Sequence, residues 1–228
     1  MKISGIEKVS LVDFDGKVST TLFCPSCNFA CPFCHNGDLV NNALPTIPEE
    51  EILTYLTNRK KLLDAVVVSG GEPTLQKDLL DFLAKIKQIG YAVKLDTNGT
   101  NPDLLLQAIQ KKLVDYVAMD VKNCLKDYPQ TVGCKKIDTD KILQSTNILK
   151  QNQVDYEFRT TLVKQFHTFE SISDMATLID GAKKLFLQKF KPAETCLSKG
   201  LLPVEKADAQ RFVNILAKHA QQVSLRGY

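Results

Sequence analysis

Apolar and polar positions along the chain follow two recurring patterns. Short, near-continuous runs of β-branched and apolar residues are typical of parallel strands that are covered on both faces. Such runs lie at residues 17–24, 65–69, 92–97, 116–121, 156–163 and 184–190. Each run ends in a polar or glycine-rich turn, and residues 223–226 are a candidate for one further short strand.

Apolar residues at helical spacing fill the segments between these runs. Residues 77–89 show this spacing and stop at Gly90, a residue that suits the left-handed position after a helix. Thr46 and Glu49 predict a capping box at the start of an earlier helix. Further helices are expected at residues 103–112, 140–150, 171–182 and 203–220.

Strands that alternate with helices at this spacing predict right-handed βαβ units and a parallel sheet. Six units are too few for a closed eight-stranded barrel, which leaves two α/β folds: a partial, laterally open (β/α)6 barrel or a flat doubly wound sheet. In both, functional residues gather where the strands end. We expect one domain over residues 1–228, with its core at about 17–195 and a C-terminal helix and tail at 203–228.

Charge and composition limit the classes of partner. The net charge of +3, from 29 basic and 26 acidic residues, is too small to indicate a nucleic acid or a membrane surface. No apolar run approaches the roughly 18–20 residues that span a bilayer. Residues 1–10 also lack the apolar region of a signal peptide. A cytoplasmic protein with no nucleic-acid or membrane partner is therefore predicted.

Four of the seven cysteines lie within residues 24–34, directly after the first predicted strand. Thiolates there are suited to zinc or to an iron–sulfur cluster. A zinc site would use all four cysteines, but zinc ribbons usually separate their two CxxC pairs by a dozen or more residues. An iron–sulfur site would use Cys27, Cys31 and Cys34 and leave one iron open. Cys24 would then be a buried thiol or an alternative ligand.

The CxxxCxxC motif that starts at Cys27, with Phe33 just before its last cysteine, resembles the signature of the radical S-adenosylmethionine superfamily. The run CPFCHN at 31–36 resembles the glycyl-radical activating enzymes, above all those of anaerobic ribonucleoside-triphosphate reductases. The resemblance extends roughly from residue 10 to residue 195. Ser26 is a departure, because such proteins often have glycine before the first ligand cysteine.

This resemblance implies both cofactors and chemistry. The three cysteines of the motif would hold a 4Fe–4S cluster, and S-adenosylmethionine would bind its open iron, with Phe33 beside it. Reductive cleavage would give a 5′-deoxyadenosyl radical, which would remove a hydrogen atom from a glycine of a partner enzyme. Flavodoxin or ferredoxin would supply the electron. The protein would then be an oxidoreductase of anaerobic metabolism.

The ends of the second and third strands carry further candidates. Gly70, Gly71 and Glu72 form the motif that in the resembled superfamily receives the ammonium group of the methionine moiety. Glycines let backbone carbonyls approach a ligand closely, and a carboxylate accepts hydrogen bonds from a cation. Asp96 and Asn98 are expected to contact the ribose hydroxyls or the methionine carboxylate, although an Asx turn would also explain them.

The fourth and fifth strands add three charged candidates. Alternation places Asp120 and Lys122 on one face of their strand, and the resemblance puts this pair near the cofactor. A surface salt bridge is the alternative. Arg159 is a candidate for binding the cofactor carboxylate, and pairing with Glu157 or Asp120 is equally open.

The length of the chain bears on the substrate. Nearly all of it is used by the strand–helix units, which leaves little for a substrate domain or a long lid. A glycine in a protein partner fits such a site, and an anaerobic ribonucleotide reductase is the predicted partner. Three alternatives remain: a small-molecule enzyme such as 7-carboxy-7-deazaguanine synthase, a pyruvate formate-lyase activating enzyme, and a non-catalytic zinc-binding module.

Overall fold

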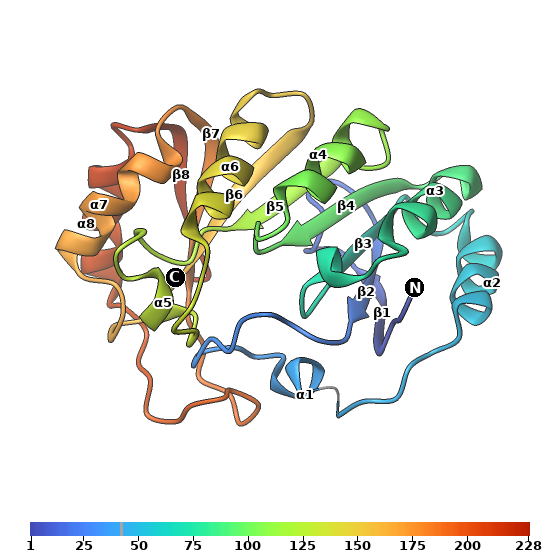
Figure 1. The fold of residues 1–228 in the computed structure, drawn as a ribbon, viewed down its shortest axis with the longest axis horizontal. Helices are drawn as coiled ribbons and strands as arrows, with labels where there is room; N and C mark the ends of the chain where they lie inside the picture. The colour runs from blue at the N-terminus through green and yellow to red at the C-terminus, as the bar shows by residue number, and fades with distance from the viewer. Residues whose placement is uncertain (42) are drawn as a thin grey trace.

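The computed structural model describes residues 1–41 and 43–228. One eight-stranded sheet runs through it in chain order, and Figure 1 shows this sheet with its helices. The strands are β1 (Gly5–Ser10), β2 (Ser19–Cys24), β3 (Ala65–Gly70), β4 (Ala92–Thr97), β5 (Tyr116–Asp120), β6 (Asp155–Leu162), β7 (Ala182–Lys189) and β8 (Ala220–Arg226). β1 pairs with β2 in antiparallel fashion, and every later neighbour is parallel.

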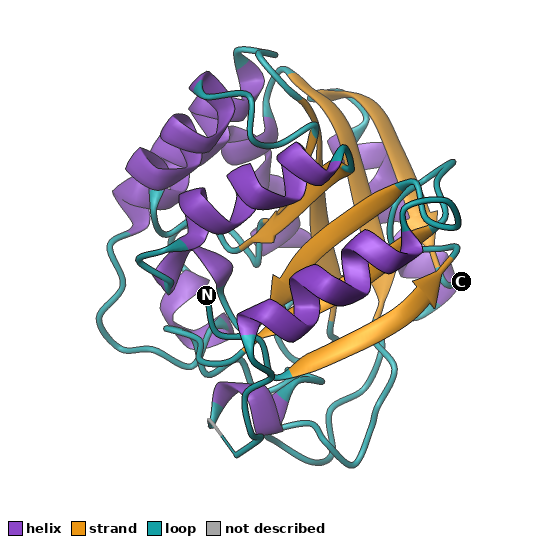
Figure 2. Cartoon of the chain, turned by 90° about the vertical axis from the view of Figure 1, so that its right-hand side faces the viewer, coloured by secondary structure: helices purple, strands orange, loops and turns teal. Residues whose placement is uncertain are grey.

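Helices follow most strands and cover the sheet, as Figure 2 shows. They are α1 (Gly37–Val40), α2 (Glu49–Arg59), a 3-10 turn (Pro73–Leu75), α3 (Leu79–Ile89), α4 (Pro102–Gln110), α5 (Tyr128–Thr131), α6 (Thr139–Lys150), α7 (Phe169–Ile179) and α8 (Lys206–Leu216). Neighbouring helices pack side by side, α4 on α6, α6 on α7 and α7 on α8. Within the described ranges, none of them has the length and apolar character to cross a membrane.

Of the two folds that the alternation left open, the partial, laterally open barrel is confirmed. The strands follow one another in chain order without the reversal of a doubly wound sheet, and the outer strands β1 and β8 do not pair with each other. All the predicted parallel strands are present, and the tail forms β8, which is longer than expected. The antiparallel β1 is an addition to the prediction. Its sequence GIEKVS is largely exposed along one edge of the sheet, so it lacks the apolar run that marks the other strands. That the chain is one domain stays a prediction.

One predicted helix start is wrong. α2 begins at Glu49 with Pro48 as its N-cap, and Thr46 does not cap it. Ile47 forms an antiparallel bridge with Ile3, and a residue before proline is disfavoured in the helical region. Both effects keep this segment extended up to Pro48. The predicted stop at Gly90 is confirmed, since Gly90 adopts a left-handed φ of 98° at the end of α3.

The loop between β1 and β2 covers the amino end of the barrel. Phe14 is buried there against Ala65 and Val67, and its ring lies 5.5 Å from that of Tyr116. Lys94, buried in β4, donates a hydrogen bond to the carbonyl of Asp13. With this end covered, the carboxyl ends of the strands form the accessible side of the barrel interior.

Candidate active site

A cavity of about 430 Å³ lies at the carboxyl ends of the strands. All the predicted site residues line it, although they come from segments far apart in the chain. They are Cys27, Cys31, Phe33, Cys34, Gly70, Gly71, Glu72, Asp96, Asn98, Asp120, Lys122 and Arg159. Cys24, the fourth cysteine of the cluster, is fully buried at the end of β2 and is not among the lining residues.

The three lining cysteines are largely shielded from water. Burial raises the pKa of Cys27 to about 11 and that of Cys31 to about 12, and the neighbouring thiols add to both shifts. The pKa of Cys24 is raised further, again by burial. Thiolates, not thiols, bind metals, so metal binding here must displace protons.

The donor set fits an iron–sulfur cluster better than a zinc ion. Among the described residues, no group of three or more His, Cys, Asp and Glu side chains is placed to hold one metal ion. Zinc needs all its sulfurs about 2.3 Å from a single ion. In a 4Fe–4S cluster each thiolate binds a different iron, so the sulfurs stand farther apart. Three thiols around one cavity suit that arrangement.

The loop that carries the cysteines (residues 24–36, the cysteine loop) is hydrogen-bonded to the glycine motif at residues 70–72. Gly71 N donates to Cys24 O and Glu72 N donates to Ser26 O, each over 2.8 Å, and Asn36 Nδ2 donates to Gly70 O over 3.2 Å. A Cβ on Gly71 would lie 1.9 Å from the Ser26 oxygen. Gly70 has a φ of 114°, and a Cβ there would lie 2.3 Å from Cys24 N and 2.5 Å from Cys24 O. The glycines are therefore needed for contact between the loops, a role the motif alone did not indicate.

Glu72 joins the ends of β3 and β4. Its side chain is 1% exposed, and its Oε1 accepts hydrogen bonds from Thr74 N and Thr97 Oγ1, while Oε2 accepts one from Asn98 N over 2.6 Å. Burial raises the pKa of this carboxyl, and these hydrogen bonds oppose the shift. The carboxylate thus organises the cavity wall, and its contact with a ligand ammonium group stays a prediction.

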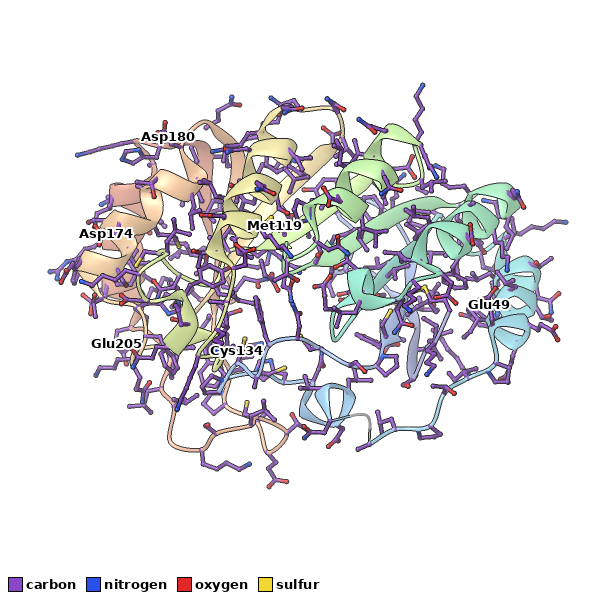
Figure 3. All side chains as sticks on the ribbon, in the orientation of Figure 1. Glu49, Met119, Cys134, Asp174, Asp180 and Glu205 are labelled. Atoms are coloured by element: carbon purple, nitrogen blue, oxygen red, sulfur yellow. The ribbon has the colours of Figure 1, made fainter. Side chains whose placement is uncertain are left out.

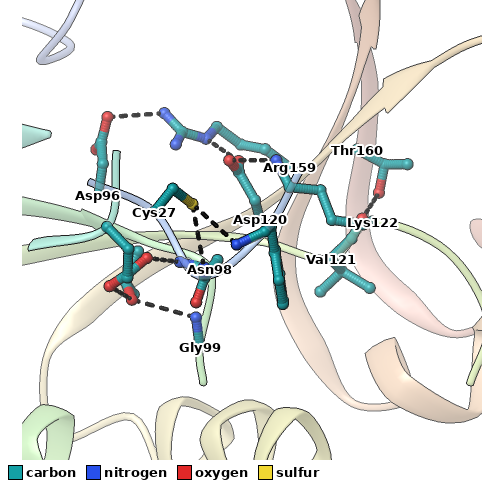
Figure 4. Close-up of polar contacts among 12 residues, drawn as sticks. Cys27, Asp96, Asn98, Gly99, Asp120, Val121, Lys122, Arg159 and Thr160 are labelled. Carbon is teal, nitrogen blue, oxygen red and sulfur yellow. Dashed lines mark hydrogen bonds and ion pairs between the residues drawn. The ribbon is translucent and has the colours of Figure 1, made fainter. Parts of the chain in front are cut away.

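A network of alternating charges crosses the cavity, as Figure 4 shows. Arg159 Nε lies 2.9 Å from Asp120 Oδ1, and its NH1 lies 3.2 Å from Asp96 Oδ2. Lys122 Nζ lies 2.9 Å from Asp120 Oδ2. Of the two partners considered for Arg159, the structure selects Asp120, because Glu157 instead accepts hydrogen bonds from Arg226 and Tyr116.

Asp120 and Lys122 do not form a surface salt bridge, since their side chains are only 28% and 15% exposed and line the cavity. Burial alone would raise the pKa of Asp120, but the charges of Arg159 and Lys122 outweigh it and lower the pKa to about 2. Asp96 Oδ1 is buried and accepts no hydrogen bond in the described part of the chain, although Lys94 Nζ lies 3.5 Å from it as an ion-pair partner. That oxygen is suited to accept a hydrogen bond from a ligand hydroxyl.

Several lining residues had not been predicted. Asp13 reaches the cavity from the loop at the amino end, and no motif marks it. Thr161 lies two residues after Arg159 on the inward face of β6, and Gln188 is its partner in β7. Strand alternation from Arg159 would have identified Thr161. For Gln188, the register of β7 against β6 was needed.

The segment after β7 folds over the cysteine loop. The His35 ring stacks on Phe190 with centroids 5.6 Å apart, and its Nε2 lies 2.6 Å from Lys191 O. Ser198 N donates to Pro32 O. From another side, Cys134, labelled in Figure 3, donates through Sγ to Asn28 O over 3.3 Å. The cysteine loop is thus supported from two sides.

The Asp120→Asn variant is expected to unfold more easily than the wild type. Breaking a buried ion pair leaves uncompensated charge, here on Arg159 and Lys122, and because Asp120 is partly exposed we expect a loss of about 2–3 kcal/mol at pH 7. The folded pKa of Asp120 lies below the unfolded value of about 3.9. Its stabilisation is therefore present above about pH 4 and lost as the pH falls towards about 2.

Urea unfolding of the cluster-free wild type and Asp120→Asn at pH 7 and near pH 3 tests this expectation. The difference between their free energies of unfolding should be smaller at the lower pH. The control is Asp155→Asn, which removes an exposed pair with Lys183 at 3.9 Å and should change little. Equal stabilities of wild type and Asp120→Asn at pH 7 would contradict the charge network.

Comparison with known proteins shows the family to which the chain belongs. Residues 21–179 match the Radical SAM superfamily. A protein of Methanocaldococcus jannaschii that is named as a glycyl-radical enzyme activating enzyme is 36% identical over 221 residues, which covers 95% of this chain and 91% of that protein. The pyruvate formate-lyase-activating enzyme of Clostridium pasteurianum is 32% identical over 151 residues, covering 63% of this chain and 62% of the enzyme.

Solved structures show the same fold. Streptococcus suis SuiB superposes with a TM-score of 0.69 at 16% identity, covering 91% of this chain and 50% of SuiB. A domain of pyruvate-formate lyase-activating enzyme from Bacteroides vulgatus gives 0.56 at 17% identity, covering 72% of this chain and 99% of that domain. With the family match and the M. jannaschii relative, the chain belongs to the radical SAM superfamily of 4Fe–4S, S-adenosylmethionine-dependent enzymes and, within it, to the glycyl-radical enzyme activating family.

Proposed function

We propose that this protein activates an anaerobic ribonucleotide reductase by reductive cleavage of S-adenosylmethionine and formation of a glycyl radical on the reductase. The size of the cavity is the main support for a macromolecular substrate. A pocket for one small ligand usually measures about 300–1,000 Å³. This cavity measures about 430 Å³, near the lower end of that range, and would have to accept both the cluster and S-adenosylmethionine, so little of it would remain for a second small molecule.

The open side of the barrel gives a protein substrate its access. β1 and β8 leave the sheet unclosed, and within residues 1–41 and 43–228 no domain-sized insertion separates the strand–helix units. A glycine on a loop of the partner can approach the cavity there while the partner itself excludes water. The run CPFCHN at 31–36 favours a reductase as that partner, and flavodoxin or ferredoxin is the proposed electron donor.

Different residues of the chain would hold the cluster and shield it from water. Cys27, Cys31 and Cys34 would hold three irons of the cluster. When bound, the cluster and S-adenosylmethionine supply the reductive cleavage and the hydrogen abstraction. Phe33, 5% exposed, provides an apolar wall, since its ring lies 5.9 Å from Phe166 and 6.4 Å from Phe190.

The charged network would orient S-adenosylmethionine. Lys122 carries three donors, of which Asp120 accepts one, and Arg159 is fixed by two carboxylates. Both cations face the cavity, where they would attract the methionine carboxylate. The backbone at Gly70 and Gly71 would receive the ammonium group, and Asp96 Oδ1 would accept a ribose hydroxyl.

Electron paramagnetic resonance tests the choice of partner. The reconstituted, reduced protein is mixed anaerobically with S-adenosylmethionine and the anaerobic ribonucleotide reductase of the same organism. We expect a glycyl-radical signal on the reductase, and none when its radical-site glycine is replaced by alanine. A signal on pyruvate formate-lyase but not on the reductase would overturn the choice of partner while leaving the enzyme family intact. Turnover with a small molecule alone would overturn the macromolecular substrate.

A further inference from the structure

The amide of Asn98, directly after β4, is oriented by its neighbours. Asn98 is 5% exposed, and its Oδ1 accepts hydrogen bonds from Thr100 N over 3.0 Å and from Thr100 Oγ1 over 2.7 Å. A backbone N–H can only donate, so the atom that faces it must be the amide oxygen. The Nδ2 group of Asn98 therefore points the other way, towards the cysteine loop.

Three side chains close a ring of hydrogen bonds at this point. Asn98 Nδ2 donates to Asn28 Oδ1 over 2.8 Å, and Asn28 Nδ2 donates to Thr100 Oγ1 over 2.8 Å. Thr100 Oγ1 in turn donates to Asn98 Oδ1. Every donor and acceptor in this ring is consistent with the others, and such chains polarise and stiffen one another. The ring uses one of the two N–H groups of Asn98 Nδ2.

The second N–H group of Asn98 faces a cluster ligand. Asn98 Nδ2 lies 3.9 Å from Cys27 Sγ, as Figure 4 shows, and Phe29 N donates to the same sulfur over 3.4 Å. In the described part of the chain, no side-chain donor is within hydrogen-bond distance of the sulfurs of Cys31 and Cys34. Cys27 is thus the ligand that combines a side-chain donor with a backbone donor.

We infer that Asn98 is a positioning residue that raises the reduction potential of the cluster through its hydrogen bond to Cys27, with Asn28 and Thr100 holding the amide in place. The inference rests on the proposed ligand set, in which Cys27 binds an iron. Reduction adds negative charge to the cluster and its sulfurs. An N–H dipole directed at one of those sulfurs stabilises the reduced state, and hydrogen bonds to sulfur are a known determinant of cluster potential.

A potentiometric titration of the reconstituted protein tests this role. Wild type and Asn98→Leu are first shown to hold equal iron and sulfide, and the signal of the reduced cluster is then followed by electron paramagnetic resonance. In Asn98→Leu, we expect the ratio of reduced to oxidised cluster at a fixed solution potential to fall about tenfold, a shift of about 59 mV to more negative potential. Asn98→Asp, which replaces the donor by a negative charge, should shift the reduction potential to a still more negative value.

Matched variants separate this effect from general damage. Thr100→Ala removes the hydroxyl that donates to Asn98 Oδ1 and accepts from Asn28 Nδ2, but it keeps the hydrogen bond from Thr100 N. The amide is then held less firmly, so this variant should lower the potential by less than Asn98→Leu, and Thr100→Ser should retain the wild-type value. Asn101→Asp makes the same chemical change three residues away, where Asn101 caps α4, and should leave the potential unchanged. If Asn98→Leu does not retain its cluster, Thr100→Ala carries the test.

Two outcomes distinguish failure of this inference from failure of the ligand set. Wild-type potentials in Asn98→Leu and Thr100→Ala, at full iron content, would overturn the role of Asn98 alone. A Cys27→Ala variant that kept a complete cluster would overturn the ligand assignment beneath it, and with it the inference.

Discussion

Replacement of Cys31 by alanine is expected to abolish 5′-deoxyadenosine formation. Cys31 is buried, lines the cavity and is the central cysteine of the CxxxCxxC motif. In the proposed ligand set, one iron of the cluster would lose its only protein ligand without this sulfur, so the cluster should not assemble in full. The measurement compares iron and sulfide content, and then 5′-deoxyadenosine by chromatography, after anaerobic reconstitution, reduction and addition of S-adenosylmethionine.

Cys24→Ala is the matched control for this experiment. Cys24 is equally buried and belongs to the same cysteine cluster, but it lies outside the cavity. We expect Cys24→Ala to keep its cluster and most of its 5′-deoxyadenosine formation, with a modest loss of stability from the missing sulfur. Loss of the cluster in Cys24→Ala, with retention in Cys31→Ala, would require a different ligand set.

Most of the sheet could be predicted from the sequence because the parallel strands β2 to β6 are largely buried on both faces. A short run of β-branched residues such as Val66-Val67-Val68 favours a covered strand, and most of these runs are followed by a segment with helical spacing. β1 was not predicted because it is an exposed edge strand, and such a strand needs no apolar run. The start of α2 was misplaced because the bridge between Ile3 and Ile47, a contact over 44 positions, decides where the chain turns into a helix.

The site could be predicted as a set of residues but not as a set of contacts. Parallel strands bring their carboxyl ends together, so polar motifs after successive strands were bound to face one cavity. Which groups then pair is decided by tertiary distances. The predicted contact of Glu72 with a ligand stays a prediction, and the motif did not indicate that its oxygens accept hydrogen bonds from Thr74, Thr97 and Asn98. Arg159 likewise pairs with Asp120 and not with Glu157, because Glu157 accepts a hydrogen bond from Arg226, which lies far away in the sequence.

Gly71→Ala is expected to disrupt the site although it replaces none of the chemistry-bearing side chains. The new methyl carbon would lie 1.9 Å from Ser26 O, a backbone atom that no rotamer change can move. The two loops would have to separate, and the hydrogen bonds from Gly71 N to Cys24 O and from Glu72 N to Ser26 O would be lost. We expect destabilisation of about 3 kcal/mol and loss of S-adenosylmethionine binding.

Urea unfolding of the cluster-free protein and equilibrium binding of S-adenosylmethionine to the reconstituted protein measure the two effects. Gly5→Ala is the control, because a Cβ at Gly5 would meet only the side chain of Phe23, at 3.4 Å, which is an ordinary contact. If Gly71→Ala matched Gly5→Ala in both measurements, the close approach of the two loops could not be what the glycine motif provides. If Gly71→Ala lost binding but kept its stability, the glycine would serve the ligand directly, as the motif alone had indicated.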